Sequence, residues 1–320
     1  MLQISVIIPV FNEEESLPEL HDWIRKVMEE YSFSYEIIFI NDGSKDNSWQ
    51  SIQQMSAENP AVKGISFTRN YGKSAALDMG FSKALGEVVI TMDADLQDSP
   101  DEIPELYRMI TAENFDVVSG WKKKRKDPIS KTIPSKFFNW VTRVISGIKL
   151  HDFNCGLKAY KNKVVKNIHI YGEMHRYIPL IAKWNGFNQI GEKVVDHKAR
   201  KYGVTKFGLE RFINGFLDLI SVSFVNRYKR KPMHFFGSLG TISFLTGFVI
   251  TVWLIFEKIR GISKGLVVRD ITDQPLFFLA LVALIVGAQL FLTGFLAEIM
   301  ASNNNKKADY NIDEELNFKD

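Results

Sequence analysis

The first 120 residues alternate between short apolar runs and longer stretches in which apolar and polar positions follow a helical spacing. Nearly continuous hydrophobicity in the short runs suits parallel strands that are buried on both faces. Strand–helix alternation of this kind predicts an α/β fold: a doubly wound, mostly parallel sheet with helices on both faces and ligands at the carboxyl ends of its strands. The predicted strands are Ile4–Val10, Glu36–Ile40, Lys63–Thr68, Glu87–Met92 and Asp116–Ser119, and the predicted helices are Glu13–Glu30, Asp46–Glu58, Gly72–Leu85 and Asp101–Glu113.

Residues 121 to about 232 contain two stretches that combine aromatic, aliphatic and basic side chains. Ile133–Ile148 places Trp140 and its apolar neighbours beside basic residues, and Phe207–Val225 leads into the basic segment Arg227–Lys231. Such a composition is typical of amphipathic helices that lie in a bilayer interface. A helix packed on a protein core shows the same pattern, so each stretch alone leaves both interpretations open.

Two later stretches, Phe235–Phe256 and Leu276–Ala297, contain no charged residue and are 22 residues long each. That length is enough to cross the hydrocarbon core of a membrane, so we expect two transmembrane helices. Their glycines allow close helix packing and would also suit association between protomers in a homo-oligomer. These glycines are Gly237, Gly240, Gly247, Gly287 and Gly294.

The charges around the two spans bear on their orientation. An even number of spans puts the N-terminal domain and the tail on one side of the membrane. Basic residues before the first span and after the second, at Lys306 and Lys307, favour a cytoplasmic location for both. The connecting loop is also basic, which weakens that preference. The tail from Ala301, rich in Asn and acidic residues, is predicted to be flexible.

Composition narrows the choice further. The 320 residues carry a formal charge of only +3, which does not indicate a nucleic-acid binder. The only cysteine, Cys155, excludes an intramolecular disulfide and is expected to be a small buried residue. Leu2–Val10 is apolar but has no basic region ahead of it, so it is interpreted as a first strand and not as a signal peptide.

The strongest chemical signal is Asp93-Ala94-Asp95-Leu96-Gln97, directly after the predicted strand Glu87–Met92. Two carboxylates at a strand end can turn toward one hard cation, and Mg²⁺ or Mn²⁺ prefers such oxygens and leaves positions for phosphate. Alternatively, these acids cap the following helix, but Asp98, Ser99 and Asp101 are available for that purpose. We therefore expect a metal site.

Two other strand ends lead to the same edge of the sheet. One carries Pro9, Phe11 and Glu13, and the other is Asn41–Ser44 with Asp42. Acidic side chains there can bind a nucleobase and ribose, and Phe11 can stack on a base. A plain turn is the alternative for Asn41–Ser44.

A third segment has the chemistry of a phosphate site. Arg69 to Lys73 opens a predicted helix, and a helix N-terminus with basic neighbours binds phosphate well. A solvated loop is the alternative for this segment.

Taken in order, these segments resemble the family-2 inverting glycosyltransferases of the GT-A fold, within them the enzymes that use polyprenyl phosphate. The group includes dolichyl-phosphate mannose synthases and bacterial undecaprenyl-phosphate glucosyl-, GlcNAc- and aminoarabinose-transferring enzymes. The motifs extend over about residues 3–230, and the two-span tail is similar to that of the bacterial members. The motifs are VIIPVFNE from Val6, NDGS from Asn41, RNYGK from Arg69 and DADLQ from Asp93.

The resemblance implies roles for individual residues. Asp95 and Gln97 would hold the metal, with Asp93 beside the nucleotide and also near the metal. Because Asn41 stands where many relatives have Asp, Asp42 becomes the expected base contact.

Further roles follow for residues beyond position 150. Arg200 and Lys206, in a segment similar to the family element Arg-x-x-Gly-x-Ser/Thr-Lys, would neutralise substrate phosphates. Asp152 would position the acceptor, and Glu173 and Arg176 would contact sugar hydroxyls.

The basic run Lys122–Lys126, which includes Arg125, and Lys136 in the first amphipathic stretch are candidates for contacting the acceptor. A solvated loop is an equal alternative for the run.

The resemblance also suggests domain boundaries. These are a GT-A catalytic domain over 1–206, with an acceptor-side segment at 121–160, an interfacial helix over 207–232, two spans within 233–300 and a tail over 301–320.

The implied reaction is a single in-line displacement in which a polyprenyl phosphate attacks a nucleotide-diphosphate sugar, UDP-sugar being preferred and GDP-mannose possible. An anionic phosphate needs little help from a base, so Asp152 is expected not to act as an essential one. The catalytic domain would lie at the cytoplasmic face of the inner or plasma membrane.

Three rival interpretations fit the sequence less well. A processive polysaccharide synthase would show a Gln-x-x-Arg-Trp element and more spans. A non-catalytic nucleotide-sugar-binding scaffold would not need Asp93, Asp95, Arg200 and Lys206. A nucleotidyltransferase would show an early Gly-rich loop, and the sequence has no glycine before Gly43.

Overall fold

The computed structural model describes residues 2–123, 139–144, 146–198, 201, 232–303 and 312–317. The chain forms two compact units. One comprises residues 1–222 together with 308–320, and the other comprises residues 223–307. Each unit is described by itself below.

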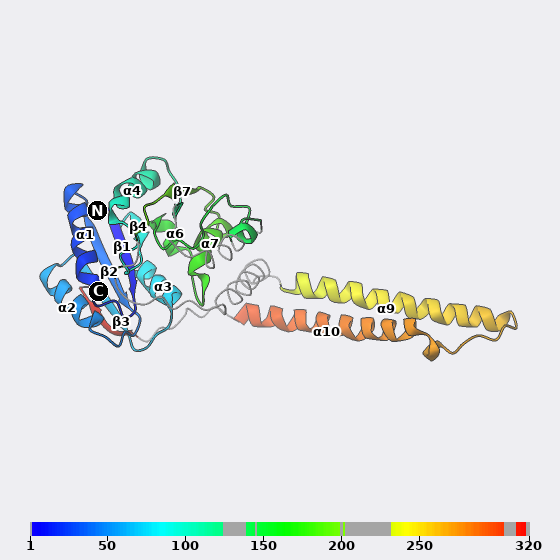
Figure 1. Cartoon of the computed structure of the whole chain (residues 1–320). Helices are drawn as coiled ribbons and strands as arrows, with labels where there is room; N and C mark the ends of the chain where they lie inside the picture. The colour runs from blue at the N-terminus through cyan, green and yellow to red at the C-terminus, as the bar shows by residue number, and fades with distance from the viewer. Residues whose placement is uncertain are drawn as a thin grey trace. The chain divides into compact units, whose positions relative to one another are not determined.

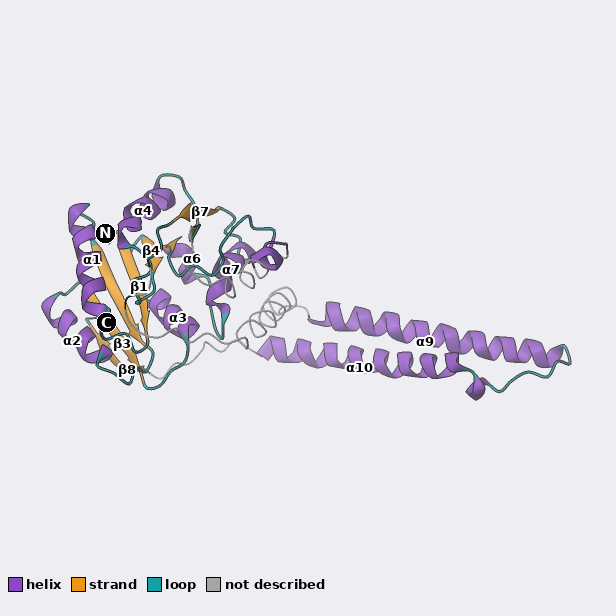
Figure 2. Cartoon of the chain, in the orientation of Figure 1, coloured by secondary structure: helices purple, strands orange, loops and turns teal. Residues whose placement is uncertain are grey.

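The first unit is built on one sheet with the strand order β7-β5-β6-β4-β1-β2-β3-β8 among the described residues (Figure 2). The central pairs β4–β1, β1–β2 and β2–β3 are parallel, whereas β6 and β8 run antiparallel to their neighbours. The predicted mostly parallel sheet is therefore confirmed. The strands are β1 Ile4–Val10, β2 Tyr35–Asn41, β3 Val62–Phe67, β4 Val88–Thr91, β5 Val117–Trp121, β6 Lys158–Lys161, β7 Ile190–Val194 and β8 Ile312–Leu316.

Helices cover both faces of the sheet because successive residues of each strand point to opposite sides. One face packs α1, α2 and α4 around Val6 and Phe39, and the other packs α3, α6 and α7 around Ile7 and Ile40. All four of these strand side chains are fully buried. The helices are α1 Leu17–Glu30, α2 Ser48–Glu58, α3 Lys73–Lys83, α4 Ile103–Thr111, α6 Asn162–Lys166 and α7 Ile178–Trp184, with 3-10 turns η1 Pro100–Glu102 and η2 Met174–Tyr177.

The C-terminal strand β8 overturns part of the prediction for the tail. Ile312–Leu316 pairs with β3 at the edge of the sheet, and Figure 1 shows it beside that strand. Leu316 packs near Ile52, and the Asn317 amide donates hydrogen bonds to the Ser56 carbonyl at 3.1 Å and the Val62 carbonyl at 2.8 Å. The prediction of a flexible tail is wrong for these residues because β3 offers an edge that the acidic composition did not reveal.

The second unit is a pair of long helices, α9 Pro232–Ser263 and α10 Pro275–Asn303, joined through the 3-10 turn η3 Ile271–Asp273. Both are long and apolar enough to cross a membrane. Their backbones approach closely at Gly240 and Gly287. A Cβ at residue 240 would lie 2.7 Å from the Gly287 carbonyl oxygen, so glycine permits this packing. Each helix extends beyond the predicted apolar stretch at both ends.

The two predicted amphipathic stretches are only partly covered. Phe207–Val225 lies outside the described residues. Within Ile133–Ile148, residues 139–144 are helical. Trp140 and Val144, one turn apart, are exposed, whereas Thr142 is buried. This helix therefore has an apolar face turned to the surroundings, and its location in a bilayer interface stays a prediction.

Candidate active site

The carboxyl ends of β1, β2 and β4 lie next to one another because these strands are neighbours in the sheet. Asn12, just after β1, ties the first two ends together. Its side-chain oxygen accepts from the Lys45 backbone N–H at 2.8 Å, and its own N–H donates to the Ser44 hydroxyl at 3.0 Å. Phe11 is left 42% exposed beside them. The predicted nucleotide edge is thus brought together, with an aromatic ring free to stack.

Within this edge, Pro9 and Glu13 are both half-buried. The Glu13 backbone N–H donates to the Ser48 hydroxyl at 3.0 Å, which anchors the start of the turn before α1. That turn explains why α1 begins at Leu17 and not at the predicted Glu13. Contact of either residue with a nucleotide stays a prediction.

Asp42 is buried and holds the phosphate-binding candidate loop in place. Its two carboxylate oxygens accept from the backbone N–H groups of Tyr71 at 2.6 Å and Gly72 at 2.9 Å. Burial raises the pKa of Asp42, and the two backbone hydrogen bonds partly oppose that rise. Within the same loop, Arg69 lies 4.8 Å from the centre of the Tyr71 ring. The expected contact between Asp42 and a base stays a prediction; the structure gives Asp42 a scaffolding role.

The motif after β4 alternates in exposure. Asp93, Asp95 and Gln97 are partly exposed, whereas the intervening Ala94 and Leu96 are 4% exposed each. Leu96 adopts a positive φ of 59°, a conformation that costs a non-glycine residue roughly 1–3 kcal/mol and concentrates at functional sites. The Gln97 backbone N–H donates to Asp95 Oδ1 at 3.2 Å. The turn presents the polar side chains on the accessible side of the strand end.

Asp98 differs from its predicted role as a helix cap. It is fully buried and forms an ion pair with Lys122 at 2.8 Å. Lys122 is itself mostly buried; burial would lower its pKa, but the Asp98 carboxylate raises it above the ordinary value. Ser99 precedes η1 without a side-chain cap. The basic run therefore begins with an inward-facing lysine, and contact of Lys122 with the acceptor stays a prediction.

Lys73, the first residue of α3, forms a close ion pair with Asp93. Burial would raise the pKa of Asp93, but the positive charges of Lys73 and Lys122 lower it well below the usual range. Gly156 packs directly on this carboxylate, because a Cβ at residue 156 would lie 2.5 Å from Asp93 Oδ2. Asp93 is therefore held ionised between a lysine and a glycine.

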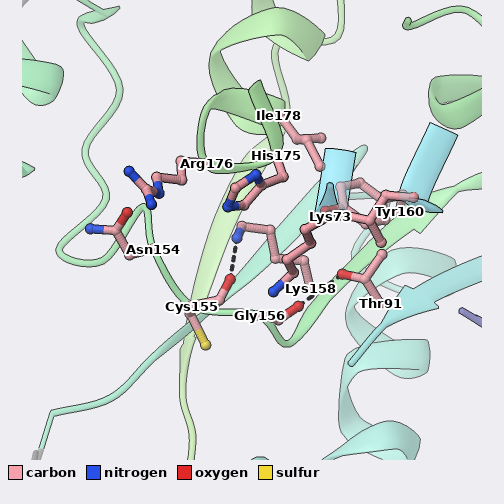
Figure 3. A pocket seen from close by; sticks show the side chains of 11 residues that line it. Lys73, Thr91, Asn154, Cys155, Gly156, Lys158, Tyr160, His175, Arg176 and Ile178 are labelled. Carbon is pink, nitrogen blue, oxygen red and sulfur yellow. Dashed lines mark hydrogen bonds between the residues drawn. The ribbon is translucent and has the colours of Figure 1, made fainter. Parts of the chain in front are cut away.

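Behind this ion pair lies a small pocket rich in cations (Figure 3). Lys158 of β6 lines it, is 3% exposed and donates to the Cys155 carbonyl. The sequence interpretation missed Lys158; a lysine in the otherwise apolar run Leu157–Tyr160 was the available signal. The other lining residues are Lys73, Leu77, Thr91, Asn154, Cys155, Gly156, Tyr160, His175, Arg176 and Ile178.

The turn η2 supplies the opposite wall of the pocket. Arg176 and His175 have side chains that are 12% and 10% exposed, whereas Glu173 is 49% exposed and lies 3.5 Å from Arg176. His175 Nδ1 lies 3.1 Å from the Ser74 hydroxyl. Burial, with the charges of Lys73 and Arg176, lowers the pKa of His175 well below its ordinary value. Of the two sugar-contact candidates, Arg176 lines the pocket.

Asp152 is 1% exposed and organises the loop that forms the pocket floor. Its carboxylate accepts from the Asn154 backbone N–H at 3.0 Å, and its own N–H donates to Glu192 at 3.0 Å. Cys155 in the same loop is buried, which raises the pKa of its thiol to about 12. The predicted buried thiol is confirmed, and the burial of Asp152 favours the predicted positioning role.

A model of glycosyl transferase family 2 matches residues 5–173, which is more than half of the chain. The chain belongs to this family. It is 37% identical over 94% of its length to dodecaprenyl-phosphate galacturonate synthase of Rhizobium johnstonii, covering 88% of that protein. It is 33% identical over 92% of its length to undecaprenyl-phosphate 4-deoxy-4-formamido-L-arabinose transferase of Aeromonas hydrophila, covering 87% of it. The resemblance inferred from the motifs is confirmed, and this family-2 chain is a glycosyltransferase.

Solved structures support the GT-A fold of this family-2 glycosyltransferase. Glucosyl-3-phosphoglycerate synthase from Mycobacterium tuberculosis, in complex with Mn²⁺ and UDP-glucose, aligns with a TM-score of 0.55 at 18% identity. The alignment covers 70% of this chain and 79% of that one. At this identity the likeness concerns the fold alone.

The motif of this family-2 glycosyltransferase fits a divalent cation. Among the residues that the structure describes, no group of three or more His, Cys, Asp or Glu side chains is placed to hold a metal. Mg²⁺ commonly takes one or two protein carboxylates and completes its shell with water and substrate phosphates. Asp95 and Gln97, partly exposed at the strand end, suit a cation shared with a diphosphate.

Four candidate site residues of this family-2 chain fall outside the part that the structure describes. Arg200 and Lys206, the candidates for neutralising substrate phosphates, lie outside the described residues, as do Arg125 and Lys136, the candidates for acceptor contact. Their roles stay predictions. The described part of the site brings together the strand ends, the Asp42-anchored loop and the cationic pocket.

Proposed function

We propose that this chain is a membrane-anchored, metal-dependent glycosyltransferase that moves a sugar from a UDP-sugar to a polyprenyl phosphate at the cytoplasmic face of the membrane. The observation that carries the proposal is the juxtaposition of Asp95 and Gln97 with the Lys73–Asp93 ion pair at the edge formed by β1, β2 and β4. Relatives that match over nine-tenths of the chain and are named for polyprenyl-phosphate acceptors support the choice of acceptor.

The reaction is a single displacement. A phosphate oxygen of the acceptor forms a bond to the anomeric carbon, the bond from that carbon to the diphosphate oxygen breaks, and the leaving UDP keeps the electron pair. Mg²⁺ or Mn²⁺, held by Asp95 and Gln97, would stabilise the negative charge on that leaving group. The acceptor phosphate is already anionic at neutral pH, so the chain needs to supply little proton transfer.

The residues of the chain contribute mainly position and charge. Phe11 offers a stacking surface for the base, and the loop anchored by Asp42 presents Arg69 and Lys73 toward the diphosphate. Asp152 fixes the loop that packs on Asp93. Its role is therefore to position that loop, and it does not itself touch the reacting atoms. Arg200 and Lys206 would neutralise the phosphates further.

The apolar helices α9 and α10 anchor the enzyme as a two-span hairpin. The pairing of β8 with β3 supports this arrangement, because a chain that leaves a sheet and later rejoins it must cross a bilayer an even number of times. The catalytic unit and the C-terminal strand then share one side. Basic residues on that side favour the cytoplasm, where the nucleotide-sugar donor is available.

The test is transfer of radiolabelled sugar into an organic-extractable lipid. The purified full chain is mixed with undecaprenyl phosphate, Mg²⁺ or Mn²⁺ and a panel of UDP- and GDP-sugars. Labelled lipid that requires the metal is expected from a UDP-sugar. Asp95→Ala should lower the rate by about a thousandfold, the upper end of the loss seen when one group that stabilises the developing charge is removed.

Asp22→Ala serves as the matched control, since Asp22 is a highly exposed carboxylate on α1, outside the site. It should leave the rate unchanged. Nucleotide binding without labelled lipid from any donor would contradict the proposal and favour a non-catalytic scaffold. Full activity in Asp95→Ala would remove the metal-holding role from this motif.

A further inference from the structure

Among the described residues, the cationic side chains that line the pocket behind Asp93 outnumber the carboxylates paired with them. Lys73, Lys158 and Arg176 all line it, and the carboxylate next to it, Asp93, is already paired with Lys73. His175, whose pKa is lowered mainly by burial, sits among these cations as a neutral ring. Figure 3 shows these side chains converging on the loop that ends at Gly156.

Lys158 is the most deeply buried of these groups, at 3% exposure. An ammonium group carries three N–H donors. Among the described residues, its hydrogen-bond acceptor is the Cys155 carbonyl. Burying a cation is costly unless it is paired and hydrogen-bonded. An anion that enters the pocket would supply the missing acceptor.

Arg176 offers a second set of donors to the same space. Its planar guanidinium has five N–H groups in a fork that matches a carboxylate. Glu173, which is 49% exposed, forms an ion pair with it at 3.5 Å, and one carboxylate leaves several of the five N–H groups available. Asn154, from the loop ordered by Asp152, lines the pocket close to Arg176 in Figure 3. The pocket therefore combines a point charge, a planar cation and an amide, which is a suitable set for a carboxylate.

The position of the pocket indicates which part of a substrate reaches it. Lys73 and Gly156 line the pocket and also contact Asp93. Asp93 is two residues from Asp95, where the proposed function places the diphosphate. The group attached to that diphosphate, the transferred sugar, is therefore the part of the donor next to the pocket. The free space is about 10 Å³, room for one water-sized group and too small for a whole phosphate.

We propose that this pocket receives the carboxylate of an acidic sugar, so that the donor is a nucleoside-diphosphate uronic acid. The inference rests on the proposed function and names its substrate class. A carboxylate oxygen matches the free space and accepts from Lys158 and Arg176 at once. A neutral sugar would place a hydroxyl there and bring no negative charge to Lys158, whose acceptor among the described residues is the Cys155 carbonyl.

The first test compares wild-type enzyme on donors that differ only at C6. UDP-glucuronate and UDP-galacturonate carry a carboxylate where UDP-glucose and UDP-galactose carry a hydroxymethyl group. The acidic sugar donor of the accepted stereochemistry should be preferred by at least about 100-fold in kcat/KM. The reason is that the neutral analogue leaves the charged N–H groups of the pocket without the acceptor they are placed to bind. This comparison requires no variant and so does not depend on whether a mutant folds.

The second test uses Lys158→Met and Arg176→Met, with Lys163→Met as the control. Lys163 is an exposed lysine of α6, 61% exposed and outside the pocket. Both pocket variants should lose most of the preference for the acidic donor, chiefly through a higher KM for that donor. The control should keep the preference, and binding of UDP alone should be retained in all three variants.

The possible outcomes separate the two proposals. Equal or better transfer from the neutral donors would overturn the uronic-acid inference and leave the proposed function standing. A raised KM for undecaprenyl phosphate with an unchanged donor preference in the pocket variants would also overturn it, since the anion would then be the acceptor's phosphate. Absence of transfer from every donor would instead contradict the proposed function.

Discussion

Two neighbouring regions of the site differ in how their charged groups are satisfied. In the loop that opens α3, both oxygens of Asp42 accept backbone hydrogen bonds from Tyr71 and Gly72. In the pocket behind Asp93, Lys158 and Arg176 offer more donors than the described residues around them accept. The first region is complete within the chain, whereas the second is completed by a ligand.

The difference separates groups that build the site from groups that recognise what enters it. A buried polar group whose partners all belong to the protein contributes to stability, and its removal leaves those partners unpaired. A buried cation without a counter-charge contributes little to stability and much to binding. Stability and activity measurements should therefore respond in opposite ways in the two regions.

The largest stability effect is expected in the loop. Asp42→Ala leaves the buried N–H groups of Tyr71 and Gly72 without their acceptor, at about 1–3 kcal/mol for each unsatisfied group. The free energy of unfolding of the catalytic unit should fall by about 2–5 kcal/mol in thermal or denaturant melts. Asp42→Asn, which keeps one side-chain oxygen, should lose clearly less. Equal stability of Asp42→Ala and wild type would show that this loop is not held by Asp42.

A smaller effect, dependent on pH, is expected for His175. Burial first, and then the charges of Lys73 and Arg176, lower its pKa in the folded state below the unfolded value of about 6.5. The unfolded state therefore binds the proton more readily, so this contribution is fully present at pH 7 and is lost as the pH falls below about 6.5. The slope is up to about 1.4 kcal/mol per pH unit, continuing down to the folded-state pKa.

The measurement is the unfolding free energy of wild type and His175→Asn between pH 7.5 and pH 5. Asparagine keeps a polar atom for the contact with Ser74 and does not titrate in this range. The difference between the two proteins should grow as the pH falls, with wild type losing more. Parallel curves over the whole range would mean that His175 is equally protonated in both states.

The smallest stability effect is expected in the pocket. Lys158→Met removes a buried cation and its hydrogen bond to the Cys155 carbonyl, two changes of opposite sign. The unfolding free energy without substrate should stay within about 1 kcal/mol of wild type. A loss of several kcal/mol would show that Lys158, like Asp42, stabilises the site. The two regions would then not differ in this respect.

Much of the sheet could be predicted from the sequence because buried parallel strands leave a strong local signal. β1 was predicted with its observed bounds, and β2 to β5 within about two residues at each end. The partly exposed polar side chains of the DADLQ motif could also be predicted, because the motif directly follows a buried strand, where the chain turns. The motifs after β1, β2 and β4 also predicted that these strand ends share one edge, and the sheet order confirms it.

What could not be predicted depends on pairing between distant residues. The ion pair of Asp98 with Lys122 joins two loops that local capping rules treat separately. Lys158 belongs to a short strand whose antiparallel place between β4 and β5 has no local signature. Strand β8 is acidic and follows the two long helices, so no periodicity connects it to β3.

The strand β8 also constrains how the molecule is made. It follows both long helices in the chain, yet it pairs with the edge of a sheet that begins at Ile4. During synthesis the β3 edge stays open until both long helices and the segment that follows them have been made. An open edge is prone to wrong pairing, so closure by β8 makes completion of the catalytic unit conditional on completion of the anchor.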